Sequence, residues 1–226
     1  MDERSLRVER PEKTLRELAL ERMRDAIIAS HFKPGERLVE RDLCMQLGVS
    51  RTIVREVLRH LESEGLVATA GTRGPVVAVT TPEQALQIYE IRGVLEGMAA
   101  RACAEKGDAK LAATLQAALD RIKSAYGRRR MDLVLDETTE FYRVLFVGAE
   151  RDVAWGIVNS LTARINRLRS MTIRTPGRDI DGPTQMQRIV DAIRDGHGEG
   201  AYHAAQEHVG IASSLARALL ADTPAA

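Results

Sequence analysis

Three arginines are spaced so that their side chains share one face of a helix, a pattern that could bind DNA. Arg51, Arg55 and Arg59 follow one another at intervals of four residues, which keeps them on one side of an α-helix. A guanidinium group donates hydrogen bonds in a planar fork that matches phosphate oxygens and the edge of guanine. A solvent-exposed arginine face gives the same spacing without binding anything, so the spacing alone leaves both interpretations open.

The elements around these arginines follow the order of a helix-turn-helix. Gly48 is placed to end one short helix, and Ser50 is placed to cap the next. A hairpin directly after that helix is typical of the winged variant, whose hairpin tip contacts the DNA backbone or minor groove. The spacing of apolar residues predicts a helix from Leu15 to about Ser30, a second over Glu40–Leu47, a third between Ser50 and Gly65, and strands over Leu66–Thr69 and Pro75–Val79.

The rest of the chain is helical in pattern. A composition shift near Thr80–Pro82 separates the two parts, which predicts a DNA-binding domain over 1–80 and a helical domain over 81–226. The expected fold class is therefore mainly α, with a winged helix-turn-helix followed by an all-α six-helix bundle. The six predicted helices cover about 83–106, 109–127, 131–147, 150–174, 183–195 and 199–221.

Composition narrows the class of protein. The chain has 226 residues, of which 44% are hydrophobic and 29% charged, and this excludes a disordered or collagen-like protein. Lys and Arg number 33 against 32 Asp and Glu, so a DNA surface has to be a local patch. Two distant cysteines, Cys44 and Cys103, do not indicate a secreted disulfide framework. Without a long apolar run or a signal peptide, we expect a cytoplasmic protein with no membrane partner.

The segment over residues 34–66, PGERLVERDLCMQLGVSRTIVREVLRHLESEGL, closely resembles the DNA-binding domain of the GntR family of bacterial transcription regulators. It departs from the family pattern at Cys44, where alanine is usual, and at Ile53, where proline is usual. Cysteine is a small apolar residue, and proline offers no donor to a base, so neither change should abolish binding. The resemblance implies DNA contacts by Arg37, Arg51 and Arg55, phosphate contacts by Ser50 and Thr52, and a wing tip at Arg73 and Gly74.

A second resemblance begins at residues 89–101, YEIRGVLEGMAAR, which look like the first helix of the FCD effector domain. A count of six helices places the chain nearer the VanR-like subgroup. Many such domains hold a divalent metal through one Asp and three His. The matching positions here are Thr138, Tyr142, Met186 and His208, and only the last keeps its ligand. We therefore expect no metal and no other cofactor.

The same positions are expected to line an effector pocket without a metal, less polar than the pockets of relatives. The resemblance directs Arg92 into that pocket, where it could hold an anion, while a surface pair with Glu96 is the competing interpretation. Asp136 and Glu140 are also four residues apart. Their offset of two residues turns them about 200° from Thr138 and Tyr142, which favours a solvated acidic face.

These observations predict a transcription regulator that acts as a homodimer on double-stranded DNA. The expected form is a repressor that leaves an inverted-repeat operator when a small-molecule effector, such as a carboxylate metabolite, binds. An alternative is a DNA-binding protein that has lost its effector and responds to a protein partner. An enzyme is not expected, since no activated nucleophile or metal cluster is evident and the glycine-containing helix connection at residues 196–200 is too short for a dinucleotide fingerprint.

Overall fold

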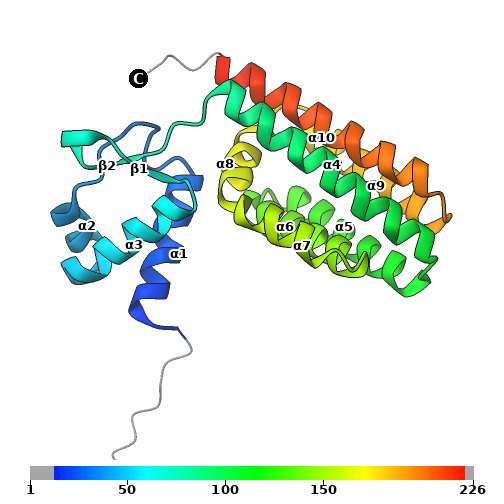
Figure 1. The fold of residues 1–226 in the computed structure, drawn as a ribbon, viewed down its shortest axis with the longest axis horizontal. Helices are drawn as coiled ribbons and strands as arrows, with labels where there is room; N and C mark the ends of the chain where they lie inside the picture. Colours follow the sequence, from blue (N-terminus) through cyan, green and yellow to red (C-terminus); the bar gives the residue numbers. More distant parts are fainter. Residues whose placement is uncertain (1–12, 222–226) are drawn as a thin grey trace, which may run out of the picture. The chain divides into compact units, whose positions relative to one another are not determined.

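The structure is a computed structural model that describes residues 13–221. The remaining parts of the expected domains, residues 1–12 and 222–226, lie outside the described residues. The chain divides into two compact units that meet between Ala78 and Val79, two residues from the expected boundary (Figure 1). Within the described residues, no helix is long and apolar enough to cross a membrane.

The first unit contains three helices and a small antiparallel sheet, as the sequence predicts. Thr14 and Glu17 form a reciprocal capping box at the start of α1, and Gly48 ends α2 in the left-handed conformation with φ of 66°. The buried core joins α1 to α3 through Met23, Ile27 and Leu61. The elements are α1 (Leu15–Ile28), α2 (Glu40–Leu47), α3 (Arg51–Ser63), β1 (Val67–Thr69), the 3-10 turn η1 (Gly71–Arg73) and β2 (Pro75–Val77).

The two strands form a hairpin in which Val67 pairs with Val77 and Thr69 pairs with Pro75. Arg37, in the segment before α2, adds an isolated bridge to Val76 on the other edge of β2. The backbone of Arg37 is therefore fixed to the wing, although 30 residues or more separate them in the sequence.

The second unit is all helical. Its longest helices, α4 and α10, pack along each other (Figure 1), and a large buried cluster that includes Phe141, Phe146 and Leu115 fills most of the space between the helices. α4 begins with a capping box between Thr81 and Gln84. The helices are α4 (Pro82–Lys106), α5 (Ala109–Gly127), α6 (Met131–Gly148), α7 (Asp152–Ser160), α8 (Thr162–Thr172), α9 (Arg178–Arg194) and α10 (Gly198–Ala221).

The count of six helices is wrong for this unit. The helix expected over 150–174 is divided at Leu161 into α7 and α8, so the described residues of this unit form seven helices. The amide of Leu161 bonds to the carbonyl of Val158 at 3.0 Å, a tight turn that contains neither glycine nor proline and leaves no sequence signal. The number of helices therefore no longer supports placing the chain near the VanR-like subgroup.

The start of α9 also differs from the expectation of a helix that begins at Pro183. The helix starts five residues earlier, at Arg178, and contains Pro183 in its second turn. Proline has no amide hydrogen, so the carbonyl of Asp179 lacks its usual partner four residues on. The sequence rule that places proline at a helix start misplaced this boundary.

Candidate nucleic-acid interface and basic cavity

The start of α3 is built to meet an anion. The hydroxyl of Ser50 accepts a hydrogen bond from the amide of Ile53 at 3.4 Å and caps the helix. The amide groups of the first turn point out of the helix end, where the helix dipole favours negative charge. Arg51 and Thr52 are exposed at this end. The arrangement suits a phosphate group beside the first turn.

Arg55 is exposed on the next turn of α3 and forms an ion pair that the sequence did not predict. Its Nε lies 2.9 Å from Oε1 and 3.0 Å from Oε2 of Glu40, the first residue of α2. This pair ties α3 to α2 and orients the guanidinium group. Glu40 also places a negative charge beside a residue expected to bind a phosphate or base.

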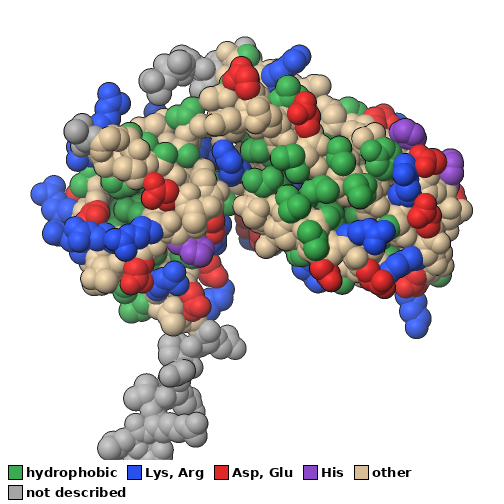
Figure 2. All heavy atoms as spheres, in the orientation of Figure 1, with side chains coloured by type: hydrophobic (Ala, Val, Ile, Leu, Met, Phe, Trp, Pro, Cys, Tyr) green, Lys and Arg blue, Asp and Glu red, His purple; other side chains and the backbone are tan. Residues whose placement is uncertain are grey.

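The wing contributes further basic groups to the same unit. Arg37 and Arg73 are both exposed. Gly74 has φ of 74° and ψ of −155°, a conformation that favours glycine, and a Cβ added there would meet nothing within 4 Å. Figure 2 shows Lys and Arg side chains gathered on the visible face of this unit, over α2 and α3. All seven residues expected to contact DNA thus belong to one compact unit.

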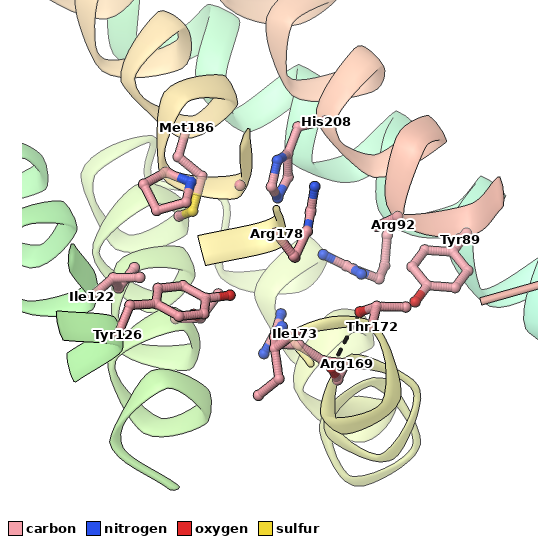
Figure 3. A pocket seen from close by; sticks show the side chains of 14 residues that line it. Tyr89, Arg92, Ile122, Tyr126, Arg169, Thr172, Ile173, Arg178, Met186 and His208 are labelled. Atoms are coloured by element: carbon pink, nitrogen blue, oxygen red, sulfur yellow. Dashed lines mark hydrogen bonds between the residues drawn. The ribbon is translucent and has the colours of Figure 1, made fainter. Parts of the chain in front are cut away.

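A cavity of about 30 Å³ lies inside the helical unit (Figure 3). Four of the five residues predicted for the pocket line it: Arg92, Thr138, Met186 and His208. Tyr142, the fifth, lines a separate cavity of about 10 Å³ instead. The two cavities share Arg92 and Arg169 in their walls.

Arg92 both lines the cavity and pairs with Glu96, as the two interpretations of the sequence propose, but the pair is not on the surface. Its Nε donates to Oε1 of Glu96 at 2.7 Å, and the two side chains are 4% and 1% exposed, so the pair is buried rather than superficial. Burial acts to lower the pKa of Arg92, but Glu96, Tyr142 and Tyr89 together outweigh it and hold that pKa above its usual value. The guanidinium group nevertheless lines the cavity.

Two further arginines in the cavity wall were missed. Arg169 donates to Oδ1 of Asn166 at 2.6 Å and to Thr139 at 3.4 Å, and burial, helped by the charge of Arg92, lowers its pKa to about 10. The buried Arg178 donates to Oε1 of Gln185 at 2.9 Å. In Figure 3 the side chains of Arg92, Arg169 and Arg178 approach the cavity from three different helices. These three arginines make the wall of the cavity more basic than the sequence indicated.

His208 lies in the same wall and carries no charge. Burial, followed by the nearby charges of Arg178 and Arg92, holds its pKa well below the usual value. Its Nδ1 is 3.1 Å from Oε1 of Gln185, the oxygen that also accepts from Arg178. Because that oxygen only accepts, Nδ1 must carry the proton, and Nε2 is left as an acceptor.

The four positions that hold a metal in similar domains do not fit a divalent cation here. The Thr138 hydroxyl donates to its own helix at the carbonyl of Val134, 2.6 Å away, and Met186 offers only a soft thioether. No group of three or more His, Cys, Asp or Glu residues among those described is arranged to hold a metal. Cationic side chains surround His208, which further opposes a cation.

Asp136 and Glu140, the acidic pair on α6, do not supply metal ligands in place of these positions. Glu140 forms an ion pair with Arg143 at 2.6 Å, with 38% of its side chain exposed. Asp136 is exposed, and neither residue lines the cavity. Their placement agrees with the solvated acidic face expected from the helical offset. The cavity as a whole is suited to an anion rather than to a metal ion.

Two family models match the chain. The model described as bacterial regulatory proteins of the gntR family matches residues 15–77, and the FCD domain model matches residues 87–210, more than half of the chain. The boundary between the matched segments falls between β2 and the body of α4.

Individual relatives agree with these matches. The chain is 34% identical to the Nta operon transcriptional regulator of Aminobacter aminovorans, over 63% of this chain and 67% of that protein. It is 25% identical to the HTH-type transcriptional repressor RspR of Escherichia coli strain K12, over 83% and 82%. The solved structure of E. coli McbR/YncC superposes with a TM-score of 0.75 at 21% identity, covering 92% of this chain and 99% of the other, and shows the fold alone.

Proposed function

This chain belongs to the GntR family of bacterial regulatory proteins with an FCD domain, and on that premise we propose that it is an anion-responsive repressor of transcription. The first unit binds double-stranded DNA through α3 and the wing, and the cavity of the helical unit binds the effector. One observation carries the proposal: exposed arginines surround the start of α3, while a separate group of arginines faces an internal cavity. No catalytic role is assigned to any residue.

We propose that the working form is a homodimer on an inverted repeat. One recognition helix reads one half-site, so a dimer doubles a basic patch that is weak in a chain of net charge +1. An exposed apolar stripe on α4 supports a partner copy: Ile91, Val94 and Met98 are 42%, 48% and 46% exposed. Figure 2 shows hydrophobic side chains gathered on the visible face of the helical unit, over α4.

Light scattering of the purified protein tests the dimer. We expect twice the monomer mass at micromolar concentration, and we expect Val94→Glu to shift the protein toward monomer because it places a charge in the apolar stripe. Ile180→Glu, at an exposed apolar position on α9, is the matched control and should leave the mass unchanged. A monomer that still binds an inverted repeat specifically would contradict the proposal.

The direction of regulation rests on a relative and on the cavity. RspR is named a transcriptional repressor, and this chain resembles it over both units. The cavity favours a small-molecule effector over the alternative of a protein partner, because Arg92 and Arg178 are buried inside the helical unit, where a protein surface does not reach. A lost effector site would have no need to keep buried cations, which cost stability.

The test is release of DNA. Operator fragments are selected from the flanking chromosome by gel shift, and a panel of small anions and neutral metabolites is added to the complex. We expect at least one anion to release the DNA, and neutral analogues to have no effect. Release by neutral compounds alone, or only by a protein fraction, would favour the alternative.

A further inference from the structure

We infer that the effector is a compact dianion, a tetrahedral oxyanion or a short dicarboxylate, held between Arg169 and Arg178. This inference rests on the proposed function and names the chemistry of its ligand. It follows from three observations: the balance of charge around the cavity, the partners of the two arginines, and the size of the cavity that both arginines line.

The charges around the cavity do not balance. Arg92, Arg169 and Arg178 supply three positive charges, His208 is neutral, and no carboxylate lines the cavity. Glu96, behind Arg92, supplies the single negative charge bonded to these groups. The set therefore carries a net formal charge of +2. A ligand of charge −2 would neutralise it, whereas a monoanion would leave one cation unmatched.

The two arginines without a carboxylate keep donors for a ligand. Arg169 bonds only to the neutral side chains of Asn166 and Thr139, and Arg178 bonds only to Gln185. A guanidinium group has five N–H donors, so each keeps donors beyond those already used. Paired forks of this kind bind phosphate and carboxylate oxygens through two parallel hydrogen bonds.

The size of the cavity limits the ligand. A water molecule needs roughly 10–15 Å³ of cavity volume, and this cavity offers about 30 Å³. The cavity therefore has room for about two or three water-sized groups, so a compact anion needs the least movement of the walls and a long chain or a ring system needs far more. The other walls are apolar at Ile122, Pro183 and Met186, which excludes water from the charged groups and strengthens their attraction for an anion.

Binding of simple anions to the full-length protein tests the inference. Malonate, oxalate, phosphate and sulfate are compared with acetate and with neutral malonamide by calorimetry, at constant ionic strength in sodium chloride. We expect a dianion to bind about tenfold or more tightly than acetate, because it gains a second charged hydrogen-bonded pair. Comparing malonate with phosphate separates a dicarboxylate from an oxyanion.

Variants of the two arginines locate the site. Arg169→Gln and Arg178→Gln should each weaken dianion binding about tenfold or more, and Arg169→Lys should restore part of it because the charge returns without the fork. Arg188→Gln is the matched control, since Arg188 is an exposed arginine of α9 paired with Glu207. A loss of binding in the control equal to that in Arg178→Gln would overturn the assignment.

Thermal melting gives a second readout of the same site, one that also measures what each variant does to stability without a ligand. Because Arg169 lacks a carboxylate partner, Arg169→Gln should melt at the same temperature as the native protein or higher, and should lose the rise in melting temperature that a dianion causes in the native protein. A variant that melts lower and keeps the dianion-induced rise would overturn the inference.

The same experiments distinguish a failure of the dianion inference from a failure of the proposed regulatory function. Dianion binding that Arg169→Gln abolishes supports the inference even when operator DNA stays bound, and in that case the proposed effector response is what fails. Release of DNA by a monoanion or a larger ligand, with no dianion binding, overturns the inference and leaves the regulator in place.

Discussion

The two units use arginine in opposite ways. In the first unit Arg51, Arg55 and Arg73 are exposed, and the ligand must come to a surface that water already covers. In the helical unit Arg92 and Arg178 are buried, and their charges are balanced only in part.

This difference shows how each unit selects its ligand. Exposed cations attract any polyanion through a field that salt screens, so selectivity on DNA comes from the few groups that reach base edges. Buried cations carry a desolvation cost that only a well-matched ligand removes, so selectivity comes from charge and size. The following predictions test this contrast, from the largest expected effect to the smallest.

The largest effect is expected where a buried charge loses its only carboxylate. Glu96→Gln leaves Arg92 buried without a counter-charge and should lower the free energy of unfolding by about 3–5 kcal/mol, measured by urea denaturation. Glu140→Gln, which breaks the solvated pair with Arg143, is the control and should cost about 1 kcal/mol or less. Equal costs would remove the distinction between buried and exposed pairs.

On the exposed side, Arg51→Ala should weaken operator binding without changing the melting temperature. The expected loss is about 1–3 kcal/mol in binding free energy, the usual value of a base contact, and a gel shift or fluorescence anisotropy titration measures it. Arg22→Ala removes an exposed arginine of α1 and is the control. If Arg51→Ala binds operator DNA as tightly as the native protein does, the assignment of α3 as the recognition helix is wrong.

A smaller effect should appear as a dependence of stability on pH. The pKa of His208 is lowered in the folded state. Below pH 6.5, about the pKa of an unperturbed histidine, the unfolded chain therefore binds a proton on this side chain and the folded chain does not. The free energy of unfolding should therefore fall as pH drops below 6.5, by up to about 1.4 kcal/mol per pH unit. His208→Gln should flatten this slope, and His203→Gln, at an exposed position, should not.

The smallest expected effect is none at all. Because cations rather than metal ligands line the cavity, dialysis against EDTA should leave the melting temperature unchanged, and elemental analysis should find no stoichiometric zinc, nickel or manganese. About one metal per chain would break the contrast, and Asp136 and Glu140 would then be the first ligands to test.

The fold was largely predictable from the sequence because local signals mark most of its boundaries. Gly48 and Ser50 place the turn of the helix-turn-helix, and Thr81 places the start of α4. The two misplaced boundaries, at Leu161 and Pro183, have local signals that are absent or misleading. There the packing of the helices, and not the residue preference, decides the structure.

The cavity was only partly predictable. The family resemblance led to Arg92, Thr138, Met186 and His208, since these residues occupy positions that a motif marks. Arg169 and Arg178 carry no such mark, and an arginine in a helix is usually on the surface. Their burial depends on how α8 and α9 pack against α4 and α10, which no short segment of sequence encodes.

Pro183 has a consequence for how a ligand enters. The first turn of α9 carries Arg178 and is joined to the rest of the helix by one backbone hydrogen bond fewer than an uninterrupted helix would provide. Opening this turn therefore needs less free energy than opening the middle of α4 or α10, and the amide hydrogens around it should exchange with solvent sooner. We therefore expect a ligand to enter by local opening of this turn, which carries one of the charges of the cavity, while the rest of the bundle stays folded.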